Sequence, residues 1–262
     1  MLYNDKVSVL MAEYNTNPEF LIESIKSILS QTYQNFELII VDDCGKNDLD
    51  SICATFKDDR IIVIHNEKNM GLAQSLNKGL EYSNCEYIIR MDTDDICLPN
   101  RFEKQIQFVI KNSQYDIVGG KHIIFDNSKE YKTKCKVSGE IKNSDFLYNT
   151  PFSHPTLILK RESIIKVGGY PNYRRGQDYA MEMNAFVHGC KGYVMDEFLV
   201  KYRQDADAYK KKNYKSRILE YKIRRAYFKK LNLPLIRIIY EIKPLIVGLI
   251  PNFLLKRFHE RG

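Results

Sequence analysis

The sequence lacks the patterns that mark several common classes of protein. The longest uncharged stretch of its C-terminal part, residues 244–255, is too short to span a bilayer. We find no repeat, no low-complexity segment and no glycine-rich phosphate loop, and because the amino terminus leads directly into a strand we expect no signal peptide. No Cys-x-x-Cys spacing occurs, which argues against a structural zinc site or a disulfide framework and favours reduced cytosolic thiols. The cysteines are scattered, at Cys44, Cys53, Cys85, Cys97, Cys135 and Cys190.

Charge is distributed unevenly along the 262 residues. Residues 201–262 hold 17 Lys/Arg and 5 Asp/Glu, a net charge of +12. Residues 1–200 hold the remaining 23 Lys/Arg and 28 Asp/Glu, a net charge of −5. The length is sufficient for a full hydrophobic core. We therefore expect one main domain with a basic helical C-terminal extension.

The N-terminal half alternates strands and helices. Asn17-Pro18 supplies an N-cap and a first-turn proline, and apolar residues then recur on one helical face at Leu21, Ile25, Ile28 and Leu29. The pattern predicts strands at 7–11, 36–41 and 60–65, further helices at 48–56 and 72–82, and a strand that leads to Asp92. This series of βαβ units predicts an α/β fold with a mostly parallel, doubly wound sheet.

Two of the predicted strands end in clustered carboxylates, at Asp42-Asp43 and at Asp92 to Asp95. Like charges this close destabilise a fold unless a metal or a basic partner compensates them. Along extended backbone Asp92 and Asp94 point the same way, so that both can bind one ion, and an all-oxygen ligand set suits Mg²⁺ or Mn²⁺. The alternative is a solvated turn in which an Asp caps the following helix.

Several motifs in order resemble family 2 glycosyltransferases, which have the GT-A fold. The resemblance covers about residues 5 to 204. The motifs that carry it are 7–15, 27–43, Asn69-Met70-Gly71-Leu72, 91–95, Gly168-Gly169-Tyr170 and Gln177-Asp178. The resemblance implies transfer of a sugar from a nucleotide-sugar donor to an acceptor hydroxyl. It also implies a Rossmann-like nucleotide-binding half, about 1–120, and an acceptor side, about 121–204.

The resemblance assigns roles to residues of the first half. The loop that contains Ala12 and Tyr14 would lie under the nucleotide. Asp43 would accept a hydrogen bond from the ring N–H of uracil, which makes a UDP-sugar the leading donor. Asp94 would be the principal ligand of the metal, and Asp92 would lie near the ribose or complete the metal shell. The ion would neutralise charge on the departing nucleotide.

In the second half, Asp178 is the candidate general base, because an acceptor hydroxyl is a weak nucleophile until its proton is removed. One base and direct attack would invert the anomeric centre. The alternative role for Asp178 is a helix N-cap. His154 is a candidate third metal ligand, with a packed loop histidine as the alternative. Arg203 is the first candidate to bind the diphosphate.

The basic segment 205–262 combines Lys and Arg with many apolar residues. We expect it to lie on the inner face of the cytoplasmic membrane, close to a glycan or lipid-linked acceptor. The alternative is a helical hairpin packed on the catalytic domain or on a second subunit. Nucleic-acid binding is disfavoured by the interleaved apolar face. Two other readings of the whole chain are a non-catalytic nucleotide-binding partner of another transferase and a sugar nucleotidyltransferase.

Overall fold

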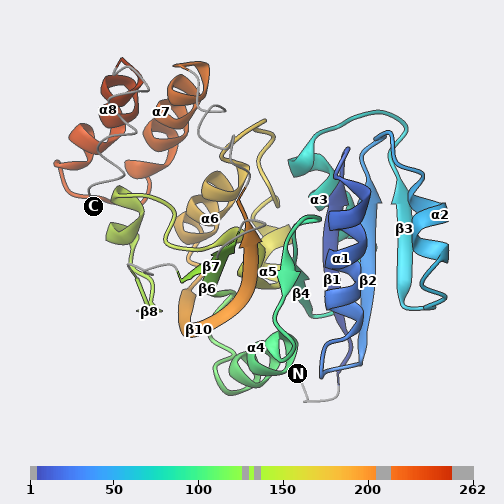
Figure 1. The fold of residues 1–262 in the computed structure, drawn as a ribbon. Coiled ribbons are helices and arrows are strands. Elements are labelled where there is room, and N and C mark those ends of the chain that lie inside the picture. The colour runs from blue at the N-terminus through green and yellow to red at the C-terminus, as the bar shows by residue number, and fades with distance from the viewer. Residues whose placement is uncertain (1–4, 126–129, 133–136, 205–213, 250–262) are drawn as a thin grey trace.

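The structure is a computed structural model that describes residues 5–125, 130–132, 137–204 and 214–249. Figure 1 shows a sheet flanked by helices, with α7 and α8 at the end opposite β3 and α2. In chain order the elements are β1 (Val7–Glu13), α1 (Pro18–Leu29), β2 (Phe36–Asp42), α2 (Leu49–Ala54), β3 (Ile61–His65), α3 (Leu72–Tyr82), β4 (Tyr87–Arg90), β5 (Ile96–Cys97), α4 (Arg101–Lys111), β6 (Ile117–Phe125), β7 (Glu130–Lys132), β8 (Gly139–Glu140), η1 (Asn143–Leu147), η2 (His154–Thr156), β9 (Ile158–Lys160), α5 (Arg161–Lys166), α6 (Gln177–Val187), β10 (Gly192–Arg203), α7 (Tyr214–Phe228) and α8 (Arg237–Gly248).

The predicted alternation of strands and helices is confirmed for the N-terminal half. Helix α1 begins at Pro18, where the Asn17 side chain accepts a hydrogen bond from Glu19 N at 2.9 Å. Helix α3 has the expected bounds, and its Gly79 permits close packing on β1, since a Cβ there would lie 2.1 Å from Cδ1 of Leu10.

The sheet has the order β3-β2-β1-β4-β9-β6-β10-β5, with β7 on β6 and β8 on β10. Strands β3, β2, β1 and β4 pair in parallel, as predicted. Beyond β4 the pairing is mixed, because β9 runs antiparallel to both β4 and β6 whereas β6 and β10 run parallel. The α/β class is therefore confirmed, and the parallel arrangement describes mainly the first half.

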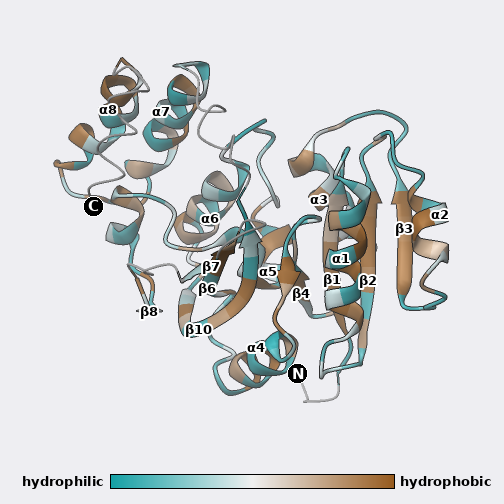
Figure 2. Cartoon of the chain, in the orientation of Figure 1, coloured by the Kyte–Doolittle hydropathy of each residue, from teal (hydrophilic) through white to brown (hydrophobic). Residues whose placement is uncertain are grey.

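Both faces of the sheet are covered. One core cluster joins the strands to α3 and α6, and the other joins them to α1 and α4. Figure 2 shows the apolar residues concentrated in the strands and on the inner sides of these helices. Burial on both faces is the expected environment for parallel strands rich in Val and Ile.

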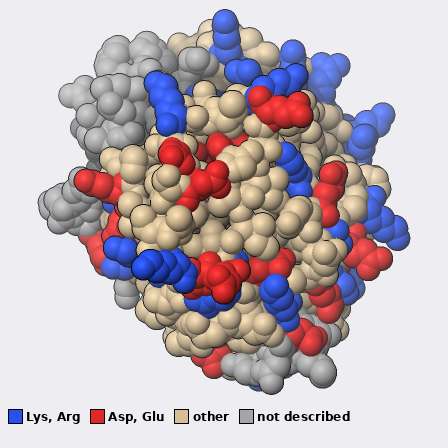
Figure 3. Space-filling view, turned by 90° about the vertical axis from the view of Figure 1, so that its right-hand side faces the viewer, with Lys and Arg blue, Asp and Glu red and all other residues tan. Residues whose placement is uncertain are grey.

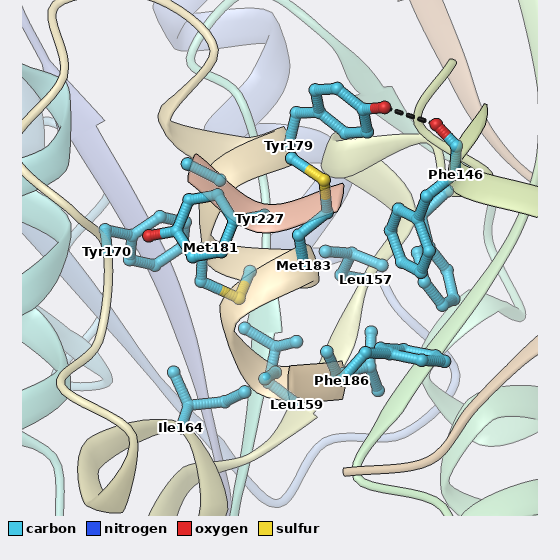
Figure 4. Packing of buried hydrophobic residues seen from close by; sticks show 14 of the residues in the cluster. Phe146, Leu157, Leu159, Ile164, Tyr170, Tyr179, Met181, Met183, Phe186 and Tyr227 are labelled. Atoms are coloured by element: carbon cyan, nitrogen blue, oxygen red, sulfur yellow. Dashed lines mark hydrogen bonds between the residues drawn. The ribbon is translucent and has the colours of Figure 1, made fainter. Parts of the chain in front are cut away.

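The C-terminal helices pack on this core. Ile223, Tyr227 and Phe228 of α7 are buried in the same cluster as Tyr179 and Met181 of α6. Figure 4 shows Tyr227 beside the α6 side chains, and it shows the hydrogen bond from Tyr179 Oη to Phe146 O. The predicted helical segment is thus present as α7 and α8, although residues 205–213 and 250–262 lie outside the described part. No helix among the described residues is long and apolar enough to cross a membrane.

Candidate active site

The carboxyl ends of β1, β2, β4, β6 and β10 lie along one edge of the sheet, as their pairings require. This edge gathers Asp43, the carboxylates after β4, and Arg203 at the end of β10. Open α/β sheets bind their ligands at such an edge.

A cavity of about 230 Å³ lies at this edge, between β1, β2 and the start of α3. Its lining includes Ala12, Tyr14 and Asp43, three residues that the sequence predicted for nucleotide binding. Tyr14 is 53 % exposed, so its ring is free to contact a ligand. The lining also contains Asn69, Gly71, Tyr173 and Arg174.

Asp43 holds the loop that leads into α3. Its Oδ1 accepts hydrogen bonds from Met70 N at 2.7 Å and from Asn66 Nδ2 at 2.9 Å. Its Oδ2 accepts from Gly71 N at 2.8 Å and from Asn69 Nδ2 at 3.0 Å. A carboxylate has about four lone-pair positions, so these four donors occupy them. A uracil N–H would therefore share an oxygen or displace one of the side-chain amides.

Asp42 also holds its surroundings in place. Its Oδ1 accepts from Gly45 N at 3.1 Å, and its Oδ2 lies 3.0 Å from Nδ1 of His65. The hydrogen bond to Asp42, with a second one to Asp50, raises the pKa of His65.

The acidic segment after β4 differs from the expected extended backbone. Strand β4 ends at Arg90 and residues 93–94 form a turn, so the alternation argument for Asp92 and Asp94 was wrong. Both side chains are nevertheless half-buried and border the same edge. Asp95 does not cap the following helix, because α4 begins at Arg101 and its N-cap residue is Asn100.

Arg203 fixes this turn to the end of β10. Its backbone N–H donates to Asp95 Oδ1 at 2.8 Å, and its Nε donates to Asp94 O at 2.9 Å. The guanidinium packs between the rings of Phe20 and Phe125 and pairs with Glu23. Arg203 thus borders a second, wider cavity of about 570 Å³ beside α1 and not the cavity that contains Asp43.

The carboxylates of the turn are costly to ionise. Burial raises the pKa of Asp94, and the neighbouring Asp92 raises it further. Burial, Asp92 and Asp94 raise the pKa of Asp95 well above its usual range, and Asp95 Oδ2 has no hydrogen-bond partner among the described residues. Oxygen ligands of this kind fit Mg²⁺ or Mn²⁺, which bind through one or two carboxylates together with substrate phosphates. No group of three or more His, Cys, Asp or Glu side chains within the described ranges could hold a metal alone.

Arg90 is a functional candidate that sequence reasoning missed. It is 2 % exposed and its Nη2 pairs with Asp92 Oδ1. Its Nε and Nη1 have no partner in the part of the chain that the structure describes. A charged residue at the end of an otherwise apolar strand, two positions before an Asp, was the available signal.

Asp178 occupies the second position of α6. The N-cap residue is Gly176, so Asp178 is not the N-cap. Burial raises the pKa of Asp178, whereas the Arg90 guanidinium lowers it and Asp92 raises it, which places these three groups within electrostatic reach. One helical turn later, buried Glu182 accepts a hydrogen bond from Thr150 Oγ1 at 2.5 Å. Burial and Asp178 raise the pKa of Glu182 well above its usual range.

His154 lies in the short helix η2 and not at the start of a strand. Its Nε2 is 3.0 Å from Tyr170 Oη, and burial together with Arg90 lowers the pKa of His154 well below its usual value. A metal at Nε2 would require this hydrogen bond to break. The metal role of His154 stays a prediction.

Comparison with known proteins agrees with this arrangement. Residues 8–169 match the family model "Glycosyl transferase family 2". The chain is 35 % identical to the putative glycosyltransferase EpsE of Bacillus subtilis, over 98 % of this chain and 94 % of that protein. It is also 35 % identical to the Escherichia coli UDP-Gal:alpha-D-GlcNAc-diphosphoundecaprenol beta-1,3-galactosyltransferase, over 79 % and 77 % of the two chains.

The solved structures share the fold. Staphylococcus aureus TarS 1–349 in complex with UDP-GlcNAc superposes with a TM-score of 0.72 at 20 % identity, and the match covers 93 % of this chain and 71 % of that one. The family match, the relatives and the fold agree. The chain therefore belongs to glycosyl transferase family 2 and is a glycosyltransferase.

Proposed function

We propose that the enzyme transfers a sugar from a UDP-sugar to a hydroxyl of a glycan or lipid-linked acceptor in surface polysaccharide synthesis, with inversion of the anomeric centre. The observation that carries this proposal is that one sheet edge holds a cavity lined by Ala12, Tyr14 and Asp43, together with the carboxylates after β4. Two names support the donor and the acceptor class. The Escherichia coli relative is named for UDP-Gal and a diphosphoundecaprenol acceptor, and the TarS structure contains UDP-GlcNAc.

In this proposal the cavity beside α3 binds the nucleoside, with Tyr14 on the base. Asp94 and Asp92 would hold Mg²⁺ or Mn²⁺, and the ion would supply Lewis-acid stabilisation of the UDP leaving group. Arg203 holds the turn that carries Asp94, since its Nε donates to Asp94 O. We therefore assign to Arg203 the positioning of the carboxylates as well as the predicted contact with the diphosphate.

Asp178 acts as the general base. The acceptor hydroxyl transfers its proton to the Asp178 carboxylate while its oxygen forms a bond to the anomeric carbon. The bond between that carbon and the diphosphate oxygen breaks, and UDP departs with the electron pair. The electrostatic influence of Arg90 and Asp92 on Asp178 supports this role.

Calorimetry with UDP, GDP and dTDP sugars, each with and without Mn²⁺, tests the proposal. We expect measurable binding of a UDP-sugar that strengthens with Mn²⁺, and product with inverted configuration by NMR. Equal binding of all three nucleotides, or a product with retained configuration, would overturn it. Tight UDP-sugar binding without turnover on any acceptor would favour a non-catalytic nucleotide-binding role.

A further inference from the structure

Helix α8 carries its apolar stripe on the outside of the molecule. Aliphatic residues follow one another at intervals of three or four positions along the segment that contains α8, and they are between 40 and 79 % exposed. They are Leu235, Ile238, Ile239, Ile242, Ile246 and Leu249. A surface helix normally turns such a stripe toward the core.

The inner side of α8 fixes this orientation. The Tyr240 ring packs edge-on against Tyr148 with 5.1 Å between centroids, and Nη1 of Arg224 on α7 donates to Tyr240 O at 3.4 Å. Pro244 is buried. Near the end of the helix, Gly248 lies so close to α7 that a Cβ there would approach Tyr214 to 2.8 Å. Polar and aromatic contacts thus hold α8, and its aliphatic stripe remains unpartnered among the described residues.

The segment that contains α7 and α8 is basic. Described residues 214–249 contain nine Lys/Arg and two Asp/Glu, a net charge of +7. On α7, Lys222 and Arg225 are exposed, and exposed Lys229 follows directly after the helix. The face that carries β3 and α2 is different, because Figure 3 shows Lys and Arg interspersed with Asp and Glu there.

We infer that α7 and α8 form a docking surface for an anionic lipid surface. The aliphatic stripe would enter the boundary between headgroups and acyl chains, and the basic residues would bind the headgroups. A second copy of the chain fits less well, since a two-fold contact would bring two regions of net +7 together. The inference extends the proposed function by placing the enzyme where a lipid-linked acceptor lies, and that extension alone rests on the proposed function.

Co-sedimentation of the full-length protein with vesicles tests the inference. The vesicles contain equal parts phosphatidylglycerol and phosphatidylcholine, or phosphatidylcholine alone. The aliphatic variant combines Ile239→Gln, Ile246→Gln and Leu249→Gln, and the charge variant combines Lys222→Gln, Arg225→Gln and Lys229→Gln. The matched control is Tyr82→Gln, an apolar residue 53 % exposed at the end of α3.

We expect the wild-type protein and the control to bind the anionic vesicles and not the neutral ones. The aliphatic variant should bind at least about tenfold more weakly. The charge variant should lose about fivefold per charge removed, which corresponds to about 1 kcal/mol for each basic residue near an anionic surface. All variants should keep the wild-type unfolding temperature, because the altered side chains are exposed.

Equal vesicle binding by the wild-type protein and the aliphatic variant would overturn the inference. A wild-type dimer that the aliphatic variant loses, without any vesicle binding, would show that a second copy covers the stripe instead. UDP-sugar calorimetry on the same proteins separates the two proposals, because vesicle binding does not depend on the donor site.

Discussion

The guanidinium of Arg90 is buried and forms an ion pair with Asp92, two residues further along the chain. The carboxylates after β4 thus have a cation inside the protein before any metal binds. Arg90 also acts electrostatically on Asp94, Asp95 and Asp178, lowering the pKa of each from the value that burial alone would give. Arg90 is therefore the buried positive charge that partly compensates the carboxylates of this site.

Replacing Arg90 tests this relationship. Arg90→Met should reduce stability by about 1–3 kcal/mol, because Asp92 loses its partner but can still be solvated from its exposed side. It should also reduce kcat/KM far more than Arg90→Lys, which keeps the charge. Chemical denaturation and steady-state kinetics measure both effects. Equal activity of the Met and Lys variants would show that the charge of Arg90 is not used.

The metal assignment predicts dependence of turnover on Asp94 and on a divalent ion. The wild-type enzyme should lose activity in EDTA and recover it with Mn²⁺ or Mg²⁺, because the carboxylates and the diphosphate oxygens together complete the ligand set. Asp94→Ala should be nearly inactive under both conditions. Asp59→Ala, an exposed carboxylate on the chain between α2 and β3, serves as the control. Wild-type transfer by Asp94→Ala in EDTA would refute the assignment.

The general-base assignment predicts separate effects on binding and turnover. Asp178→Asn keeps the shape of the side chain but cannot accept a proton. It should therefore bind the UDP-sugar normally and lose about two to four orders of magnitude in kcat. Calorimetry and single-turnover assays measure the two quantities. Normal turnover by Asp178→Asn would leave Asp178 with a structural role at the start of α6.

Activity should also depend on pH through Asp178. Its pKa is raised, so the base is ionised and active only above that raised value. As the pH falls through this raised pKa, kcat/KM should decrease, and the midpoint of the pH profile should lie above the ordinary Asp pKa of about 3.9. Arg90→Lys should leave this midpoint nearly unchanged, whereas Arg90→Met should move it to higher pH. A midpoint that is the same in all three proteins would exclude electrostatic coupling between Arg90 and Asp178.

The first half of the fold was predictable because its signals are local. Strands such as β2 are continuous apolar runs, and α1 has both an N-cap at Asn17 and a periodic apolar face. Strand β10 was missed, since Asp196 and Glu197 interrupt its apolar pattern and its pairing with β6 shifts register on both sides of Phe198. Periodicity fails where a strand bulges.

The site was partly predictable for the same reason. Asp43 and the Asp92–Asp95 segment follow apolar strands, so their shared edge follows from the βαβ pattern. The contacts of Arg203 with Asp94 and of His154 with Tyr170 join residues far apart in sequence. Such contacts depend on the tertiary packing that brings the end of β10 to the turn after β4, and η2 to the segment before α6, which no local pattern encodes.

The role of Asp43 can be decided by comparing two nucleotides. Asp43→Asn replaces one carboxylate oxygen by an NH₂ group that faces N–H donors, so two of the four hydrogen bonds to the loop before α3 are lost. We expect the free energy of unfolding to decrease by about 2 kcal/mol or more, since hydrogen bonds to a buried charged group contribute about 1.5–3 kcal/mol each.

If Asp43 also accepts a hydrogen bond from uracil, the Asp43→Asn variant should lose its preference for UDP over CDP. If Asp43 only holds the loop, the affinities for UDP and CDP should fall by the same factor. Asp42→Asn, which alters the neighbouring carboxylate but not this loop, is the matched control, and unchanged stability of Asp43→Asn would contradict the anchoring role itself.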